Sequence, residues 1–345
     1  MNNIIIWKPT ETLKCNIKKI NTNQYNIVGV IANENDYGLL KKKFDYIIIS
    51  FENYKMTRKI LENDFDISSE KILTFEEFWV LGCEEKINEK YLMYWKQWNG
   101  GLFKDKRVCI IGGGSGIGKE TAIAYKYAGA EVIIAGRNEN KLKKVSKKYG
   151  FKYMCWDITD VKNNDKMIKK ITQMIGADIN IVVNCAGIWS GDNFFEVTEE
   201  EYDSILDTNL KGAYFLCQSF AKYYIERHIK GRIVNVISNV GFLPTVKPYG
   251  ISKWGLVGLT KGLGMNLAEY GIIVNGIAPG SVATEELAGW SEGDCPARRN
   301  SKIGRIAFPS EVAQQILMLS SFMGDNMPGE VVVFDGGDKT FGLRY

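Results

Sequence analysis

Short apolar runs alternate with polar or amphipathic stretches along the chain. From Leu102 onward these runs are Arg107–Ile111, Glu131–Ala135, Ile179–Asn184, Arg232–Ser238, Ile272–Ile277 and Glu330–Phe334. Apolar runs of this length are typical of buried strands, and the stretches between them are helical in pattern. Six or seven strands that alternate with helices predict an α/β fold: a doubly wound, Rossmann-like parallel sheet of about seven strands.

The first 99 residues have a different character. Their apolar runs are Ile4–Trp7, Ile27–Ile31 and Tyr46–Ser50, and their helical stretches are Leu39–Lys43, Lys55–Asn63 and Glu76–Val80. This alternation predicts a smaller α/β domain with a parallel sheet. The first run is followed by KPTETLK, which has no glycine where a dinucleotide-binding turn needs one. We therefore expect residues 1–99 to form an accessory domain without a nucleotide motif and residues 102–345 to form the second domain. Trp95, Trp98 and Gly100–Gly101 mark the linker.

Composition narrows the class of protein. A net charge of +4 over 345 residues gives no reason to expect a nucleic-acid or membrane partner. We expect no membrane span and no signal segment. The seven cysteines are scattered without a C-x-x-C pair, which indicates reduced thiols in a cytoplasmic protein. With one histidine, the chain has almost no material for a His-based metal site or a Ser-His triad, so we expect no metal.

A glycine-rich turn follows the run Arg107–Ile111. The sequence GGGSGIGKE leads into the helical stretch TAIAYKYAGA, and its glycines have the spacing Gly112-x-x-x-Gly116-x-Gly118. Glycines let the backbone approach a pyrophosphate at a helix N-terminus, where free N–H groups attract anions. The spacing does not fit G-x-G-x-x-G, and a magnesium-binding P-loop is disfavoured because Glu120 stands where Ser or Thr is needed. A glycine-rich turn without a ligand is the structural alternative.

Arg137 is the candidate that selects the cofactor. It follows the run Glu131–Ala135, and no carboxylate at Ala135 or Gly136 could accept the ribose hydroxyls of NAD. A guanidinium there offers a fork for a 2′-phosphate, so we expect NADP(H) to be preferred over NAD(H). The alternative is a solvated arginine in a turn. Asp157 and the adjacent Ile158, in CWDITD, are placed at the adenine.

Tyr249 and Lys253 form the candidate catalytic pair. They stand four residues apart in YGISK, downstream of the run that ends at Ser238, and this spacing puts both on one helix face. A free phenol titrates near pH 10, and a neighbouring ammonium lowers that pKa. A shift of about three units corresponds to roughly 4 kcal/mol of differential interaction. The same spacing also occurs by chance on solvated helix faces.

The ordered set of motifs resembles the short-chain dehydrogenase/reductase family, in its single-domain branch. The matching segments are GGGSGIG at 112–118, NCAG at 184–187, Asn209 in DTNLKG, Ser238, YGISK at 249–253 and IAPGSVAT at 277–284. They lie within about 70% of the chain. The resemblance implies a nicotinamide-dependent oxidoreductase with an extra N-terminal α/β domain.

The resemblance also implies roles for individual residues. Tyr249 would be the general acid/base, Ser238 would hydrogen-bond the substrate oxygen, and Lys253 would lower the tyrosine pKa and hold the nicotinamide ribose. Asn209 would position a water that links Lys253 to solvent. The residues implied to bind the cofactor are Gly112, Ser115, Gly116, Ile117, Gly118, Asn184, Ala186, Gly187, Tyr249, Lys253, Pro279, Gly280, Val282 and Thr284.

The sequence departs from the family pattern at three places. Ile111 stands where Thr is usual, and Cys185 replaces the commoner Asn. Ser238 precedes Tyr249 by eleven residues, slightly closer than usual, and is assigned because Gly241 follows three residues later.

The expected activity is reduction of a carbonyl or oxidation of a secondary alcohol, on a small-molecule substrate. A sugar or nucleotide-sugar in surface-polysaccharide metabolism is one substrate class, and a 3-oxoacyl thioester is the alternative. A non-catalytic NADP-binding sensor or scaffold is the alternative of another kind. Substrate specificity should lie in Trp189–Phe195, Phe242–Pro248 and Glu285–Ile306, where Arg298, Arg299 and Arg305 could grip a phosphate or remain solvated. The resemblance further implies a homodimer or homotetramer.

Overall fold

The computed structural model describes residues 2–7, 25–32, 34–49, 54–68, 71–74, 101–189, 193–284, 287 and 302–338. The predicted helix Glu76–Val80, the linker residues Trp95 and Trp98, and the arginines Arg298 and Arg299 lie outside these ranges. The chain divides into two compact units; residues 2–74 of the described part belong to the smaller and residues 101–338 to the larger.

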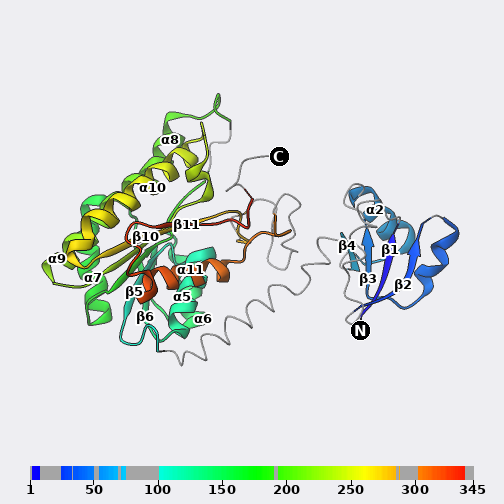
Figure 1. Ribbon diagram of the computed structural model, residues 1–345, viewed down its shortest axis with the longest axis horizontal. Helices are drawn as coiled ribbons and strands as arrows, with labels where there is room; N and C mark the ends of the chain where they lie inside the picture. Colours follow the sequence, from blue (N-terminus) through cyan, green and yellow to red (C-terminus); the bar gives the residue numbers. More distant parts are fainter. Residues whose placement is uncertain are drawn as a thin grey trace. The chain divides into compact units, whose positions relative to one another are not determined.

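The smaller unit is built on a parallel sheet. Its described elements are β1 (Asn2–Trp7), β2 (Tyr25–Ile31), the 3₁₀ helix η1 (Glu34–Lys41), β3 (Tyr46–Ile49), α2 (Tyr54–Phe65) and β4 (Ile72–Thr74). The strand order is β2-β1-β3-β4 (Figure 1). This confirms a small α/β unit, whose core includes Trp7 stacked on Tyr37 with ring centroids 5.3 Å apart. Strand β4 was not predicted, because three residues are too short to form a recognisable run.

The larger unit contains a seven-stranded sheet. Its strands are β5 (Arg107–Ile111), β6 (Glu131–Gly136), β7 (Lys152–Cys155), β8 (Ile181–Asn184), β9 (Arg232–Val236), β10 (Ile273–Pro279) and β11 (Val331–Phe334). All pairings are parallel, in the order β11-β10-β9-β8-β5-β6-β7 (Figure 1). The doubly wound prediction is confirmed. The seventh strand is β7, which no apolar run marked because it lies at the sheet edge and exposes Lys152 and Cys155.

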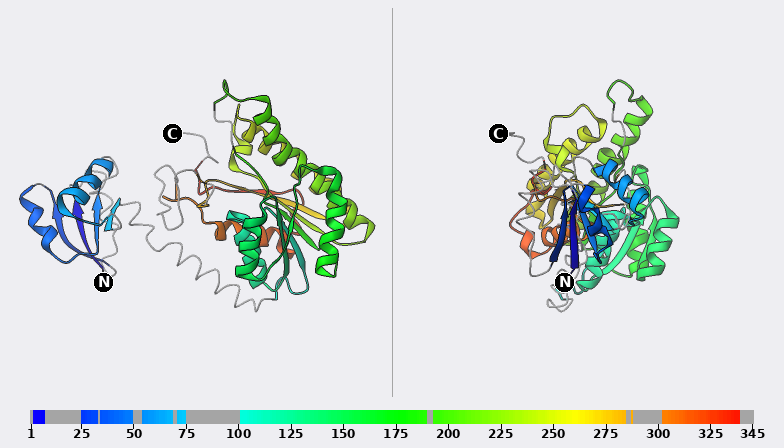
Figure 2. Two further views of the ribbon diagram at one scale, coloured as in Figure 1. Left: turned by 180° about the vertical axis from the view of Figure 1, so that it is seen from behind. Right: turned by 90° about the vertical axis from the view of Figure 1, so that its right-hand side faces the viewer.

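Helices cover both faces of this sheet (Figure 2). The described helices are α5 (Gly116–Tyr127), α6 (Glu139–Tyr149), α7 (Asn164–Ile175), α8 (Glu199–Leu206), α9 (Ala213–Glu226), α10 (Pro248–Leu267) and α11 (Pro309–Ser320). Short 3₁₀ helices are η4 (Val161–Asn163), η6 (Asn239–Phe242), η7 (Ala268–Tyr270) and η8 (Phe322–Gly324), and η5 (Asp207–Gly212) is a π-helix.

The alternation of side chains along each strand separates two cores. On β5, Val108 and Ile110 pack with α5, α6 and α11, whereas Cys109 and Ile111 pack on the opposite face with α7 and α9. This is the period-two pattern of a strand buried on both faces, and it explains why β5 is apolar at four consecutive positions.

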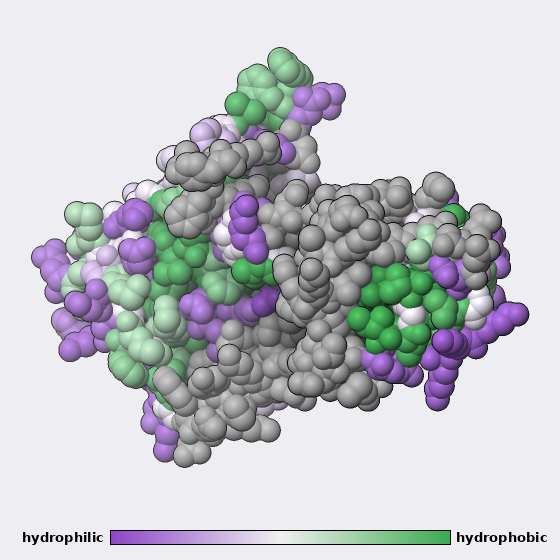
Figure 3. Space-filling view, turned by 45° about the vertical axis from the view of Figure 1, so that its right-hand side comes forward, coloured by the Kyte–Doolittle hydropathy of each residue, from purple (hydrophilic) through white to green (hydrophobic). Residues whose placement is uncertain are grey.

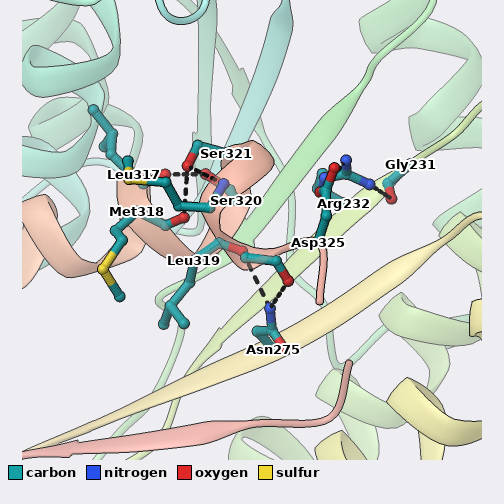
Figure 4. Close-up of polar contacts among 11 residues, drawn as sticks. Gly231, Arg232, Asn275, Leu317, Met318, Leu319, Ser320, Ser321 and Asp325 are labelled. Atoms are coloured by element: carbon teal, nitrogen blue, oxygen red, sulfur yellow. Dashed lines mark hydrogen bonds and ion pairs between the residues drawn. The ribbon is translucent and has the colours of Figure 1, made fainter. Parts of the chain in front are cut away.

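A buried asparagine ties one edge of the sheet to its helix. The Asn275 amide on β10 donates to the carbonyl oxygens of Leu319 (3.2 Å) and Gly324 (3.4 Å), and its Oδ1 accepts from the Glu330 amide (Figure 4). The carbonyl groups at the end of a helix lack partners within the helix. The Asn275 side chain supplies a hydrogen-bond donor for the Leu319 carbonyl near the end of α11. It also holds Glu330, the residue that precedes β11.

No helix in the described ranges is both long enough and apolar enough to cross a membrane.

Candidate active site

A cavity of about 750 Å³ opens where the strands β5, β6, β8, β9 and β10 end. In doubly wound sheets, ligands bind at this carboxyl edge. Predicted site residues that line it are Gly112, Ser115, Gly116, Ile117, Gly118, Arg137, Asp157, Ile158, Ala186, Gly187, Ser238, Tyr249, Lys253, Pro279, Gly280, Val282 and Thr284. Asn184 and Asn209 are the two predicted residues that do not line it.

The glycine-rich turn packs tightly against neighbouring backbone. Gly112 has a φ of +79°, and a Cβ there would lie 2.9 Å from the Cys185 carbonyl carbon. A Cβ on Gly118 would lie 2.2 Å from the Gly112 oxygen, so only glycine allows α5 to start so close to the turn. The first turn of α5 lines the cavity through Gly116, Ile117 and Gly118, and the N–H groups of a helix N-terminus suit a pyrophosphate.

Gly187 lines the cavity near two of the predicted catalytic residues. A Cβ at Gly187 would lie in ordinary van der Waals contact, 3.4 Å from Asn209 Oδ1 and 3.5 Å from Lys253 Nζ. The lining therefore includes Arg137, the glycine-rich turn, Gly187 and Lys253, a set that fits an extended dinucleotide.

Basic and acidic side chains lie at the far end of the cavity, beyond β6 and β7. Arg137 follows β6 and is exposed, as the prediction requires. Lys141 and Asn138 also line the cavity there, and the sequence analysis missed them. Lys141 has no sequence signal of its own, because it is one of several lysines in this stretch. Asp157 Oδ1 accepts hydrogen bonds from the Thr159 amide (3.0 Å) and hydroxyl (2.8 Å), so it also shapes its own turn.

The catalytic candidates meet at the start of α10. Ser238 follows β9 and caps η6, and its hydroxyl lies close enough to the Tyr249 phenol to lower the pKa of that group. The Lys253 ammonium donates to the Val236 carbonyl (3.2 Å) and lies 5.5 Å from the centre of the Tyr249 ring. Ser238 and Lys253 are buried, Tyr249 is half-buried, and all three line the cavity.

Burial governs the protonation of this group. It raises the pKa of Tyr249 above its usual value, and the hydrogen bond with Ser238 partly offsets the rise. Burial lowers the pKa of Lys253 to about 8, against a smaller opposing effect of Cys185. The expected lowering of the Tyr249 pKa is therefore not met by the polypeptide alone, because loss of water around the phenolate outweighs the other influences.

Asn209 lies in the π-helix η5 and supports the site from behind. Its Nδ2 donates to the Ile188 carbonyl (2.9 Å) and to the Ser252 hydroxyl (3.2 Å), and its Oδ1 accepts from the Ile188 amide (2.8 Å). The side chain thus joins the segment after β8 to α10. Its predicted role in positioning a water stays a prediction.

Asn184 is buried at the end of β8. Its Oδ1 accepts from the Ala186 amide (3.2 Å), while its Nδ2 finds no partner within the part of the chain that the structure describes. It shapes the turn that carries Cys185 and Ala186 into the cavity.

Cys185 replaces an asparagine of the family pattern and also lines the cavity. Burial raises its pKa to about 12, and the charge of Lys253 opposes the rise. The thiol therefore stays protonated at neutral pH and is a poor nucleophile.

The expected substrate region is only partly described. Trp189 lines the cavity, and the segment before α8 projects from the larger unit with Phe194 and Phe195 exposed by 59% and 92% (Figure 3). Asn239, Ser281 and Asp338 add polar groups that the sequence analysis did not single out. Arg305 does not line the cavity; it forms a two-point ion pair with Glu311 (2.6 and 2.9 Å).

Comparison with known proteins agrees with this geometry. Residues 106–294 match the short chain dehydrogenase family. A 3-oxoacyl-[acyl-carrier-protein] reductase, FabG, of Thermotoga maritima is 35% identical over 243 residues, which cover 67% of this chain and 97% of the relative. The FabG reductase of Chlamydia muridarum is 32% identical, covering 68% and 98%. This chain belongs to the short-chain dehydrogenase/reductase family and is an oxidoreductase of that class.

Solved structures place the larger unit in the same fold. A short-chain type dehydrogenase/reductase from Mycobacterium marinum superposes with a TM-score of 0.64 at 31% identity, covering 70% of this chain and 98% of that one. A structure of ElxO with NADP bound has a TM-score of 0.61 at 28% identity, covering 68% and 98%.

Proposed function

We propose that the protein is an NADP(H)-dependent oxidoreductase that reduces a carbonyl or oxidises a secondary alcohol, with Tyr249 as general acid/base. The observation that carries the proposal is that one cavity is lined by the glycine-rich turn and by Ser238, Tyr249 and Lys253, with the Lys253 ammonium 5.5 Å from the centre of the Tyr249 ring. A proton donor, an orienting hydroxyl and a cation in a water-poor site are the groups that carbonyl reduction needs.

In the reductive direction, each residue of the site has a separate role. When bound, a reduced nicotinamide supplies the hydride to the carbonyl carbon. The Ser238 hydroxyl donates a hydrogen bond to the carbonyl oxygen, and Tyr249 gives that oxygen its proton, so that C=O becomes H–C–O–H. Lys253, with a pKa of about 8, is mostly protonated at pH 7 and stabilises the phenolate that remains.

The preference for NADP(H) over NAD(H) rests on Arg137 and Lys141. Both line the cavity after β6, whose last residues Ala135 and Gly136 offer no carboxylate to accept ribose hydroxyls. Fluorescence titration with NADPH and NADH tests this preference directly. We expect NADPH to bind at least tenfold more tightly; tighter binding of NADH would contradict it.

Two substrate classes remain in the proposal. The relatives named as 3-oxoacyl-[acyl-carrier-protein] reductases favour a 3-oxoacyl thioester. A keto sugar or nucleotide-sugar is the class we inferred from the small N-terminal unit. A screen that follows NADPH oxidation with acetoacetyl thioesters, keto sugars and sugar phosphates separates them, because each outcome names a different class.

A non-catalytic NADP-binding sensor is the rival of another kind. All four tetrad positions, Asn209, Ser238, Tyr249 and Lys253, are filled, which counts against it. Dinucleotide binding without turnover on any substrate of the screen would favour the sensor.

We also propose a homodimer or homotetramer assembled through α9 and α10. Large apolar side chains are exposed on both helices: Tyr214 on α9, and Trp254 and Met265 on α10. Light scattering coupled to size-exclusion chromatography tests the proposal, and a monomer at micromolar concentration would contradict it.

A further inference from the structure

Positive charge is concentrated at one edge of the larger unit. Residues 137–170 contain eleven Lys or Arg and four Asp or Glu, a net charge of +7, whereas the whole chain carries +4. All eleven cationic residues are exposed. The remaining residues therefore sum to −3, and the excess belongs to this segment, which we call the cationic edge.

The cationic edge wraps around the outermost strand. Helix α6 packs on one face of the sheet through Leu142 and Val145, and α7 packs on the other through Ile168 and Ile171 (Figure 1). Strand β7 lies between them at the end of the sheet. The lysines of both helices thus surround one edge, on two sides of the same strand.

The cationic edge is continuous with the cavity. Arg137 and Lys141 belong to both, because they line the cavity and open the segment. Most of the other lysines do not line it, Lys144, Lys147 and Lys169 among them. They cannot act as ligands there, so their influence on a bound molecule would come through the electrostatic field.

A dinucleotide is the anion that this field would meet first. NADPH exceeds NADH by one phosphate monoester, about −1.5 to −2 charges at pH 7. A surface of one sign beside a cleft raises the association rate of an oppositely charged ligand by about 10- to 1,000-fold, and the effect falls steeply with ionic strength. The reach of the field is about 8 Å at physiological ionic strength and about 30 Å at 0.01 M.

We propose that the cationic edge steers the anionic dinucleotide into the cavity and acts on its association rate rather than on its residence time. The inference rests on the proposed use of NADP(H). Continuity with the cavity favours the cofactor over a nucleic acid as the anion, because Arg137 and Lys141 join the cationic edge to the cavity lining. The lysines of α6 and α7 other than Lys141 are then kinetic determinants that touch no part of the bound cofactor.

The test compares two charge-reversal variants with the same net change. Lys144→Glu/Lys147→Glu/Lys169→Glu lowers the charge of the cationic edge, and the control Lys104→Glu/Lys106→Glu/Lys230→Glu changes exposed lysines near the amino ends of β5 and β9. Stopped-flow fluorescence measures NADPH association and dissociation from low to high salt. A second variant, with glutamine at 144, 147 and 169, removes the three charges without reversing them and can be measured if the first variant misfolds.

We expect the test variant to bind NADPH about tenfold more slowly at low salt. Its dissociation rate should stay within twofold of wild type, and the difference in association should vanish near 0.5 M salt, where the Debye length is only a few ångströms. The glutamine variant should show a smaller decrease, the control almost none, and NADH a weaker dependence than NADPH.

Several results would overturn the inference. An NADPH association rate that is unchanged in the test variant would do so. An equal decrease in the control variant would also do so, as would a change in the dissociation rate alone. Loss of heparin binding with unchanged NADPH association would assign the surface to a polyanion instead. If the wild-type protein binds neither NADPH nor NADH, the proposed function is wrong and this inference with it. If the wild-type protein binds NADPH and the test variant associates with it at the same rate, only this inference is wrong.

Discussion

At the scale of single residues, Lys253 carries the largest electrostatic cost that the site imposes on the fold. The residue is 3% exposed, and its ammonium donates to the Val236 carbonyl and lies over the Tyr249 ring. Burial lowers its pKa to about 8, so the folded state disfavours the charge that the chemistry requires. Active sites that bury a charged group in this way lower the stability of the fold in return for catalytic activity.

This cost predicts a dependence of stability on pH. Because the folded pKa of Lys253 lies below its unfolded value, both states are protonated below pH 8, and the penalty is then fully present. As pH rises from 8 toward 10.5 the folded protein loses its proton first, so stability increases. From pH 7.5 to 9.5, wild type should gain about 2 kcal/mol of unfolding free energy relative to Lys253→Met. Urea unfolding of both proteins at the two pH values measures it; a parallel pH response would contradict the assignment.

Arg305 shows how a residue flagged for binding can be structural. It pairs with Glu311, which also accepts the Phe308 amide at the start of α11, and both side chains are largely buried. Removing one member of a buried pair leaves the other unpaired, at a cost of about 3 kcal/mol. We expect Arg305→Met to lower stability by that amount without a specific effect on substrate KM. The control Lys143→Met, which breaks the exposed pair with Glu139, should leave stability almost unchanged. A raised substrate KM in Arg305→Met at unchanged stability would instead indicate that Arg305 binds the substrate.

The same scale shows what the residue pattern could and could not reveal. Ser238, Tyr249 and Lys253 were identified because order and spacing bring a strand end beside one helix face. The raised pKa of Tyr249 was not anticipated, because burial of a phenol depends on tertiary packing. Lys141 was missed because one lysine among many on α6 has no mark of its own until the cavity is known.

At the scale of elements, the junction of β5 and α5 fixes the cofactor end of the site. The Gly118 Cα lies so close to the Gly112 carbonyl that any side chain must displace the turn. Gly114 in the same turn is less confined, since a Cβ there would lie 3.2 Å from the Lys141 Cβ.

The two glycines therefore predict different outcomes for the same substitution. Gly118→Ala should weaken dinucleotide binding by more than tenfold and lower the melting temperature, because its Cβ would meet backbone atoms that cannot move independently. Gly114→Ala should stay within about threefold of wild-type affinity. Titration and thermal unfolding of both variants provide the measurement, and equal tolerance of the two would show that the turn is less constrained than described.

Element prediction succeeded where strands are buried on both faces. The strands β5, β6, β8, β9 and β10 have continuous apolar runs because helices cover both sides of them. Strand β7 and β4 in the smaller unit escaped, the first because its sequence KYMC contains no run of aliphatic residues such as the valines of the other edge strand β11, and the second because it is three residues long. The π-helix at Asn209 has no sequence signature of its own.

At the scale of the whole molecule, the chain combines a catalytic unit of one family with a smaller α/β unit. The cavity described above belongs entirely to the larger unit, so its chemistry can be argued without the smaller. The proposed role of the cationic edge fits this organisation, because the excess positive charge lies in the larger unit, beside the cofactor end of its cavity.

The central claim is that Tyr249 transfers a proton in the cavity that binds the dinucleotide. Steady-state reduction of the substrate found in the screen, measured for wild type and Tyr249→Phe alongside NADPH titration, tests it most directly. We predict a loss of at least about 100-fold in kcat, since general acid catalysis contributes about 10²–10⁴. The NADPH Kd should change by less than about threefold, because the phenyl ring keeps its place against Ser238 and Lys253. Turnover undiminished in Tyr249→Phe would contradict the account.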